Sequence, residues 1–160
     1  LRNSARSESM PNLSMPRVHY ATQLFRPNQE VRYHELLHCI SVNSRFPEVA
    51  RTTVFTDHCE LPIINDHVHC LPIDRRATYS DFLALGNESA QDYDYFIFCN
   101  TDILLTRSFF ELLPHITLPT TLGCITRREV NGELPPKMDP AYTQDSCVLL
   151  SHSFNEQLLK

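Results

Sequence analysis

Glycine is scarce in this sequence of 160 residues, where it occurs only as Gly86, Gly123 and Gly132. Glycines so far apart cannot form the Gly-x-Gly-x-x-Gly turn of a dinucleotide-binding fold or the glycine-rich phosphate loop of P-loop enzymes. The Gly-x-Ser-x-Gly motif around an esterase nucleophile is excluded for the same reason. The sequence therefore argues against the common NAD enzymes, P-loop kinases and typical esterases.

Long hydrophobic runs are also missing. No stretch approaches the ~20 apolar residues that a membrane-spanning helix needs, and no apolar segment follows the basic residues near the N-terminus. The six cysteines lie mostly inside short apolar runs, without the close spacing of a secreted disulfide framework. We therefore expect reduced, buried thiols, no transmembrane segment and a cytoplasmic location.

A basic surface is the third absence. The chain has 19 acidic and 14 basic residues, for a formal net charge of −5. Its arginines occur in scattered pairs such as Arg75-Arg76 and Arg127-Arg128, whereas nucleic-acid-binding proteins usually cluster basic residues on one face. This distribution disfavours a nucleic-acid partner and suits a small phosphate-bearing ligand better.

The length is sufficient for one domain with a sizeable core, but not for two full domains. Residues 1–16 are rich in Ser, Asn and Arg and show no hydrophobic period. We expect this segment to be a flexible lead-in or an expression remnant. Residues 17–160 are expected to form the single domain.

Apolar or β-branched runs alternate with segments of helical period along this domain. We expect strands at 18–25, 52–56, 68–73, 93–99, 121–126 and 147–150, and helices at 33–43, 78–85, 108–113 and 154–160. Gly86 is expected to end the second helix, and 128–143 to be a long loop. The alternation predicts an α/β fold: an open, mostly parallel sheet with helices on both faces.

In such a sheet, ligands bind beyond the carboxyl ends of the strands. Four polar groups come directly after expected strands: Asp57, Arg75 with Arg76, Asn100 with Asp102, and Arg127. If those strands are parallel, the groups converge on one edge. A carboxylate for a nucleoside, an arginine for a phosphate and an aspartate for a metal would together form a nucleotide-sugar site.

The most distinctive of these groups is Asn100-Thr101-Asp102, which follows the most hydrophobic strand. A carboxylate at the end of a buried strand is costly unless its charge is compensated. Mg²⁺ or Mn²⁺ would compensate it, because these ions commonly use one or two protein carboxylates together with substrate phosphates. The alternative is that Asp102 only turns the chain after the strand, as Asx residues often do.

Here the sequence resembles a known family. The stretch 92–106 resembles the Asp-x-Asp-type metal motif of GT-A-fold glycosyltransferases, in the variant with Asn in place of the first acid. Three further segments resemble a family 2-like branch: Arg-x-x-Glu-Leu-x-x-Cys in 32–43, Arg-x-x-Tyr-x-Asp-Phe in 76–83, and Thr-Gln-Asp at 143–145. The resemblance extends over residues 17–152, through short motifs.

The resemblance implies that Asp102 binds Mn²⁺ or Mg²⁺ held by the diphosphate of a nucleoside-diphosphate sugar. It also implies that Asp57 lies near the nucleoside, that Arg75 or Arg76 touches the donor, and that Asp145 lies near the reacting sugar. Asp145 is then the candidate general base for a hydroxyl acceptor such as a glycan. Its alternative roles are a cap or an ion-pair partner of Arg127.

Two other functions stay open. A chain of this length leaves little room for an acceptor-binding subdomain, so we expect that further parts belong to a larger protein. The first alternative is a non-catalytic domain that keeps this fold and acts as an interaction or scaffolding module of a larger protein. A nucleotidyltransferase shares the sheet architecture but usually has a glycine-rich basic segment near its first strand, which Arg26-Pro27-Asn28-Gln29 is not.

Overall fold

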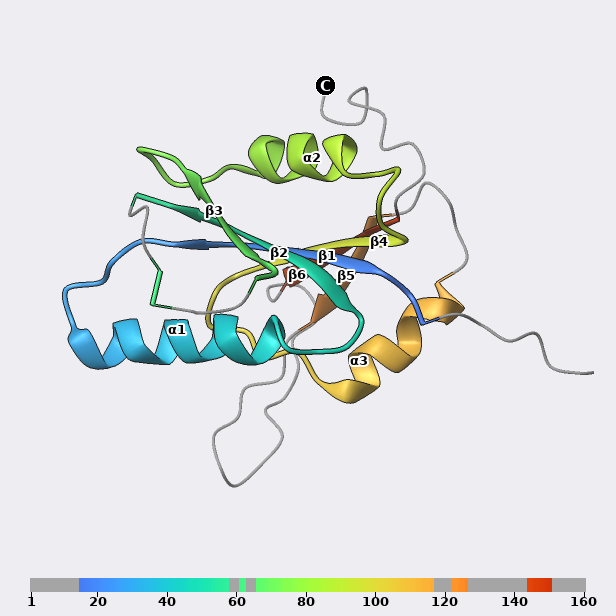
Figure 1. Cartoon of the computed structure of the whole chain (residues 1–160), viewed down its shortest axis with the longest axis horizontal. Helices are drawn as coiled ribbons and strands as arrows, with labels where there is room; N and C mark the ends of the chain where they lie inside the picture. The colour runs from blue at the N-terminus through green and yellow to red at the C-terminus, as the bar shows by residue number, and fades with distance from the viewer. Residues whose placement is uncertain (1–14, 58–60, 63–65, 117–121, 127–143, 151–160) are drawn as a thin grey trace, which may run out of the picture.

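The computed structural model describes residues 15–57, 61–62, 66–116, 122–126 and 144–150. Within them, six strands form one sheet, and Figure 1 shows its helices packed on either side. The strands are β1 (Val18–Leu24), β2 (Val49–Thr56), β3 (Val68–Pro72), β4 (Tyr95–Cys99), β5 (Leu122–Thr126) and β6 (Gln144–Leu150). The helices are α1 (Glu30–Asn43), α2 (Tyr79–Glu88), α3 (Arg107–Leu112) and the short 3₁₀ helix η1 (Leu113–His115).

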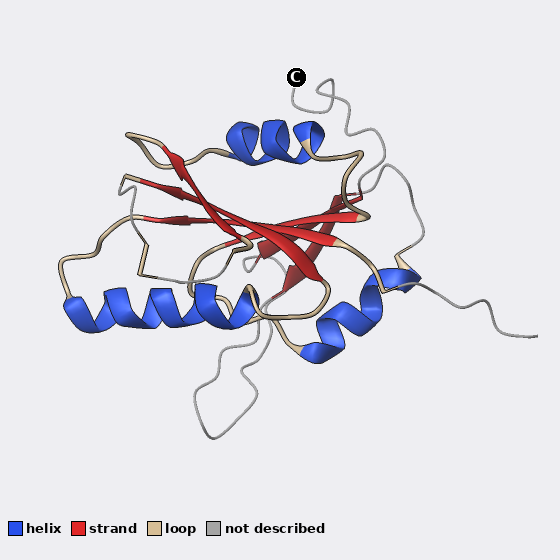
Figure 2. Cartoon of the chain, viewed as in Figure 1, coloured by secondary structure: helices blue, strands red, loops and turns tan. Residues whose placement is uncertain are grey.

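The strand order is β3-β2-β1-β4-β6-β5. Strands β3, β2, β1 and β4 are parallel, whereas β6 is antiparallel to both β4 and β5. Two antiparallel pairings in succession make β5 parallel to β4. In Figure 2, α2 covers one face of the sheet and α1 and α3 cover the other. The predicted α/β fold, with an open, mostly parallel sheet and helices on both faces, is therefore confirmed.

Strand β4 is covered on both faces, as its nearly continuous apolar run predicts. On the α2 face, Phe96 and Phe98 belong to an aromatic cluster in which Phe82 of α2 stacks on Phe98, with ring centroids 4.9 Å apart. On the opposite face, Ile97 packs with Phe110 and other residues of the α3 region. This double burial places β4 in the centre of the sheet.

The α1 helix forms where the apolar spacing predicts it. Leu37 and Ile40 are buried against the sheet, and Tyr33 and Leu36 pack at the margin of the same cluster. The helix begins at Glu30, three residues before Tyr33, and the side chains of Glu30 and Val31 in its first turn are exposed, although Val31 is apolar. The spacing of apolar residues therefore identifies the buried face of α1 better than it identifies the residue at which the helix begins.

Gly86 does not end α2, which continues to Glu88. A Cβ added to Gly86 would lie 2.9 Å from Cδ1 of Phe96. The absence of a side chain lets the helix approach the sheet closely at this point. The expected helix end was wrong because the glycine serves packing rather than termination.

Three cysteines have described side chains, and all are free thiols: Cys39 and Cys99 are buried, and Cys70 is half-buried. Burial raises the pKa of the Cys39 thiol, which keeps it protonated and inert. None of the helices in the described residues has the length and apolar content to cross a membrane.

Candidate functional site

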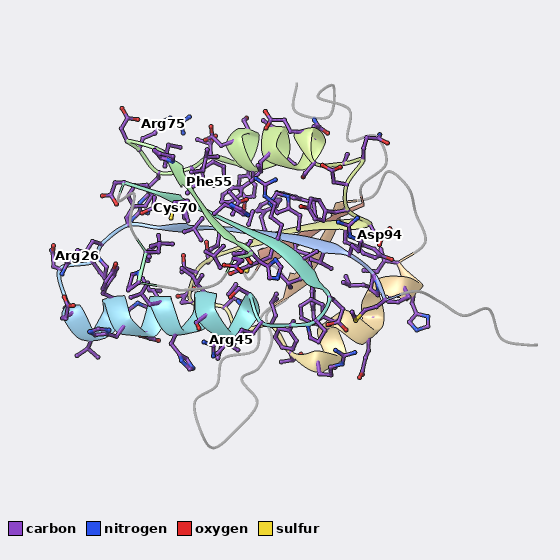
Figure 3. All side chains as sticks on the ribbon, viewed as in Figure 1. Arg26, Arg45, Phe55, Cys70, Arg75 and Asp94 are labelled. Carbon is purple, nitrogen blue, oxygen red and sulfur yellow. The ribbon has the colours of Figure 1, made fainter. Side chains whose placement is uncertain are left out.

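The carboxyl ends of β1, β2, β3 and β4 lie at one edge of the sheet, because these strands are parallel. We call the loops that follow them, residues 25–29, 57, 73–78 and 100–106, the carboxyl edge. Figure 3 shows Arg26 and Arg75 at this end of the molecule, and Asp94, which precedes β4, at the opposite end. Asp57, Arg75, Arg76, Asn100 and Asp102 all belong to the carboxyl edge.

Asp102 is held by an arginine from a distant part of the chain. Its Oδ2 accepts a hydrogen bond from Nη2 of Arg32, on α1, at 2.7 Å. The other terminal nitrogen of Arg32, Nη1, lies 2.8 Å from Oε2 of Glu35. The hydrogen bonds to Glu35 and then to Asp102 raise the pKa of Arg32. The side chains of Arg32 and Asp102 are 39% and 30% exposed, so the pair is fixed in place but accessible to a ligand.

The backbone that carries Asp102 is tied to β1. Thr22 Oγ1 donates a hydrogen bond to the Cys99 carbonyl at 2.8 Å, and Thr101 Oγ1 donates one to the Gln23 carbonyl. Thr22 and Thr101 are both buried. The N–H of Ile103 donates to the Asn100 carbonyl at 3.2 Å, which closes a turn around Asp102. Strand β1 and the loop after β4 therefore form one hydrogen-bonded unit.

On the far side of this turn, the loop contacts Asn43, the last residue of α1. The Asn43 amide nitrogen donates to the Ile103 carbonyl at 2.8 Å, and its Oδ1 accepts from the Leu105 N–H at 2.9 Å. Helix α1 thus contacts the loop through Arg32 and through Asn43.

The loop between β3 and α2 fastens the start of that helix. Arg75 forms a two-pronged ion pair with Asp81, with Nη1 2.7 Å from Oδ2 and Nη2 2.8 Å from Oδ1. Asp81 also accepts hydrogen bonds from the N–H and hydroxyl of Thr78, both at 2.7 Å, which completes a capping box. The Arg75 hydrogen bond, followed by those from Thr78, holds the pKa of Asp81 well below its usual range.

This arrangement distinguishes the two predicted donor-binding arginines. The guanidinium of Arg75 is occupied by Asp81, whereas Arg76 is exposed and its side chain has no partner among the described residues. The N–H of Ala77 donates to Oε1 of Gln23 at 3.0 Å, so the loop is also tied to β1. Of the pair, Arg76 is the residue whose guanidinium is available to a phosphate.

Two predicted residues lie in or beyond the C-terminal strands. Arg127 and the loop 128–143 lie outside the described residues, although β5, which ends at Thr126, is parallel to β4. Asp145 lies near the start of β6, whose register pairs Ser146 with Cys99 of β4. The backbone therefore reaches the carboxyl edge at Asp145, and its role as a general base stays a prediction.

The described residues contain no group of three or more His, Cys, Asp or Glu side chains that could hold a metal ion. Mg²⁺ or Mn²⁺ shared with a diphosphate needs only one or two protein carboxylates. Asp102 is an oxygen donor of that type, and Asn100, two residues earlier on the same loop, carries an amide oxygen. The donor set fits a metal that arrives with its substrate.

Sequence reasoning missed Arg32 as a residue of the site. Arg32 and Glu35 were recognised only as parts of a helix motif. Their spacing of three indicates an ion pair on an exposed helix face, and the structure has that pair. No local pattern indicates that the same face meets Asp102, 70 residues later in the chain.

Comparisons with known proteins assign no family, because no family model matches the chain and no curated protein matches it. Among the solved structures, 45 chains match. One is the 4-diphosphocytidyl-2C-methyl-D-erythritol synthase from Anaerococcus prevotii, with 7% identity, a TM-score of 0.49, and coverage of 85% of this chain and 70% of that chain. A similarity this slight supports no conclusion about substrate or reaction, so the assignment depends on the geometry of the site.

Proposed function

We propose that this protein is a glycosyltransferase that moves a sugar from a nucleoside-diphosphate sugar to a hydroxyl acceptor, such as a glycan, with Mn²⁺ or Mg²⁺. The observation that carries the proposal is Asp102: a partly exposed carboxylate on a loop tied to β1, at the edge where parallel α/β sheets bind ligands. The resemblance of residues 92–106 to the metal motif of GT-A enzymes supports the same reading.

The charge around Asp102 supports the proposal of a metal. Asp102, Arg32 and Glu35 comprise two carboxylates and one guanidinium, which leaves a net charge of −1. Such a group repels a bare diphosphate and attracts a cation. A divalent ion bound to the diphosphate reverses the sign of the interaction and stabilises the leaving group.

The other residues of the edge then have complementary roles. Arg76, exposed and without a described partner, is suited to a donor phosphate, while Arg75 stabilises the loop that presents it. Asp57 and Asn100 are exposed at the ends of β2 and β4, where a nucleoside and the metal-bound diphosphate would lie. Asp145 is proposed as the base that removes the acceptor proton.

Ligand-induced thermal stabilisation tests this function. UDP, GDP and CMP are each added with and without Mn²⁺, and the melting temperature is measured. A ligand at a hundred times its Kd stabilises the folded state by about 2.7 kcal/mol, which raises the melting temperature of a chain of this size by about 5–10 °C. We expect a nucleoside diphosphate with Mn²⁺ to produce this shift, and hydrolysis of one nucleotide sugar in a donor panel.

Two variants of the same ion pair locate the metal. Asp102→Asn removes the charged ligand and is expected to abolish the Mn²⁺-dependent part of the shift. Arg32→Met breaks the same ion pair but keeps the carboxylate, so the Mn²⁺-dependent part should persist. An unchanged shift in Asp102→Asn would remove Asp102 from the metal site.

The products separate the remaining functions. Release of pyrophosphate from a nucleoside triphosphate, with no turnover of nucleotide sugars, would identify a nucleotidyltransferase instead. If none of the nucleotides stabilises the wild-type protein, the domain is a non-catalytic interaction module.

A further inference from the structure

Asn43 is a fully buried polar residue at the end of α1, with 0% of its surface exposed. A buried amide is costly unless its donors and acceptor are paired. Its nitrogen donates to the Tyr20 hydroxyl at 3.2 Å and to the Ile103 carbonyl at 2.8 Å, and its oxygen accepts from the Leu105 N–H at 2.9 Å. Every polar atom of the side chain therefore has a partner.

Two of these three bonds go to the loop that carries Asp102. Asn43 binds the Ile103 carbonyl and the Leu105 N–H, which are backbone groups just after Asp102 in the chain. Thr101, just before Asp102, is bonded to β1. Asp102 thus lies between two anchored points, which restricts where its carboxylate can lie.

Helix α1 contacts this loop at two places, one partly exposed to solvent and one buried. Arg32, in its first half, binds the carboxylate of Asp102, while Asn43, at its end, binds the backbone that follows. The Arg32 contact is partly exposed and can exchange with solvent or ligand. The Asn43 contacts are sealed in the core and cannot.

We propose that Asn43 is a positioning residue: through Ile103 and Leu105 it fixes the Asp102 loop in the arrangement that binds a metal-bound nucleoside diphosphate. This inference rests on the proposed function. Groups that orient a metal ligand without touching the metal typically change affinity by about 10- to 100-fold when they are removed.

The test compares Asn43→Ala with Tyr20→Phe. Asn43→Ala removes both loop contacts. Tyr20→Phe removes the third partner of Asn43 and leaves the loop contacts in place, so it is a matched buried control. Binding of UDP, GDP and CMP, each with Mn²⁺, is measured by calorimetric titration well below the melting temperature.

Both variants are expected to lower the melting temperature, but only Asn43→Ala should raise the nucleotide Kd, by about tenfold or more. Equal affinities in the two variants would overturn the proposal. If Asn43→Ala does not fold, Asn43→Ser replaces it, since a hydroxyl one atom closer to the backbone cannot reach both loop groups.

Amide hydrogen exchange of the free protein separates this inference from the proposed function. Asn43→Ala should accelerate exchange at Leu105 more than Tyr20→Phe does, because the Leu105 N–H loses its acceptor. Unchanged exchange at Leu105 would overturn the positioning role whatever the ligand. If the wild-type protein binds no nucleotide, the proposed function fails, while local acceleration at Leu105 still supports the restraint on the loop.

Discussion

Two polar clusters on different parts of the sheet differ in what they leave accessible. His19 of β1 is 0% exposed, with Nδ1 2.9 Å from the Ser89 hydroxyl and Nε2 2.8 Å from the Thr53 hydroxyl. Asp102 and Arg32, at the carboxyl edge, are paired as closely, but both reach solvent. The first cluster is closed to any ligand, whereas the second presents charge to one.

Burial also sets the charge of each cluster. Desolvation, with smaller contributions from the charges of Arg51 and His69, lowers the pKa of His19 to about 3. The imidazole is therefore neutral near pH 7 and contributes only to stability. The comparison predicts opposite phenotypes: changes at His19 should alter stability without affecting ligands, and changes at Asp102 should do the reverse.

The largest expected effect is acid destabilisation through His19. Between about pH 6.5 and pH 3 the unfolded chain protonates this histidine and the folded protein does not. The free energy of unfolding should therefore fall as the pH falls, by about 1.4 kcal/mol per pH unit from this group, and the full contribution is present above about pH 6.5. Urea unfolding across a pH series measures it.

His19→Gln is the control for this prediction, because glutamine retains hydrogen-bonding groups but does not titrate. The free energy of unfolding of the variant should depend less steeply on pH over the same range than that of the wild-type protein. At neutral pH, added nucleotides should shift the melting temperature of the variant as much as that of the wild type. If the two proteins lost stability equally as the pH falls, His19 would not be the group whose protonation destabilises the fold.

A smaller effect is expected at Asp81, which lies at the carboxyl edge but has a structural role. Asp81→Ala removes the capping box of α2 and should lower the free energy of unfolding by about 1 kcal/mol, within the range measured for helix caps. Arg75→Met keeps the capping box and removes only an exposed ion pair, so it should lower the free energy of unfolding less than Asp81→Ala does. Chemical denaturation measures both, and a larger loss in Arg75→Met would reverse the order of the two contributions.

The smallest effect on stability is expected from Arg32→Met. Exposed ion pairs typically contribute about 0.2–1 kcal/mol, so the unfolding midpoint in urea should shift little. A loss of more than about 2 kcal/mol would group this pair with His19 as a buried structural contact and weaken its assignment to a ligand site.

The elements show where sequence reasoning succeeded. Strand β4 was predicted from a continuous apolar run, and α1 from apolar residues at helical spacing, because burial on one or two faces imposes those patterns directly. Gly86 was misread because a glycine near a helix end and a glycine beneath an aromatic ring look the same in sequence. The contact with Phe96 that explains it exists only after the helix packs on the sheet.

The sequence by itself determined the α/β class, the mostly parallel sheet with its carboxyl edge, and the position of Asp102 directly after β4. These features follow from periodicity and from the order of strands along the chain. Tertiary structure alone decided that Arg32 pairs with Asp102, that Asp81 pairs with Arg75, and that Asn43 bonds to the loop that carries Asp102. Ion pairs and buried hydrogen bonds between distant segments depend on how helices pack on the sheet, and side-chain geometry of that kind leaves no period in the sequence.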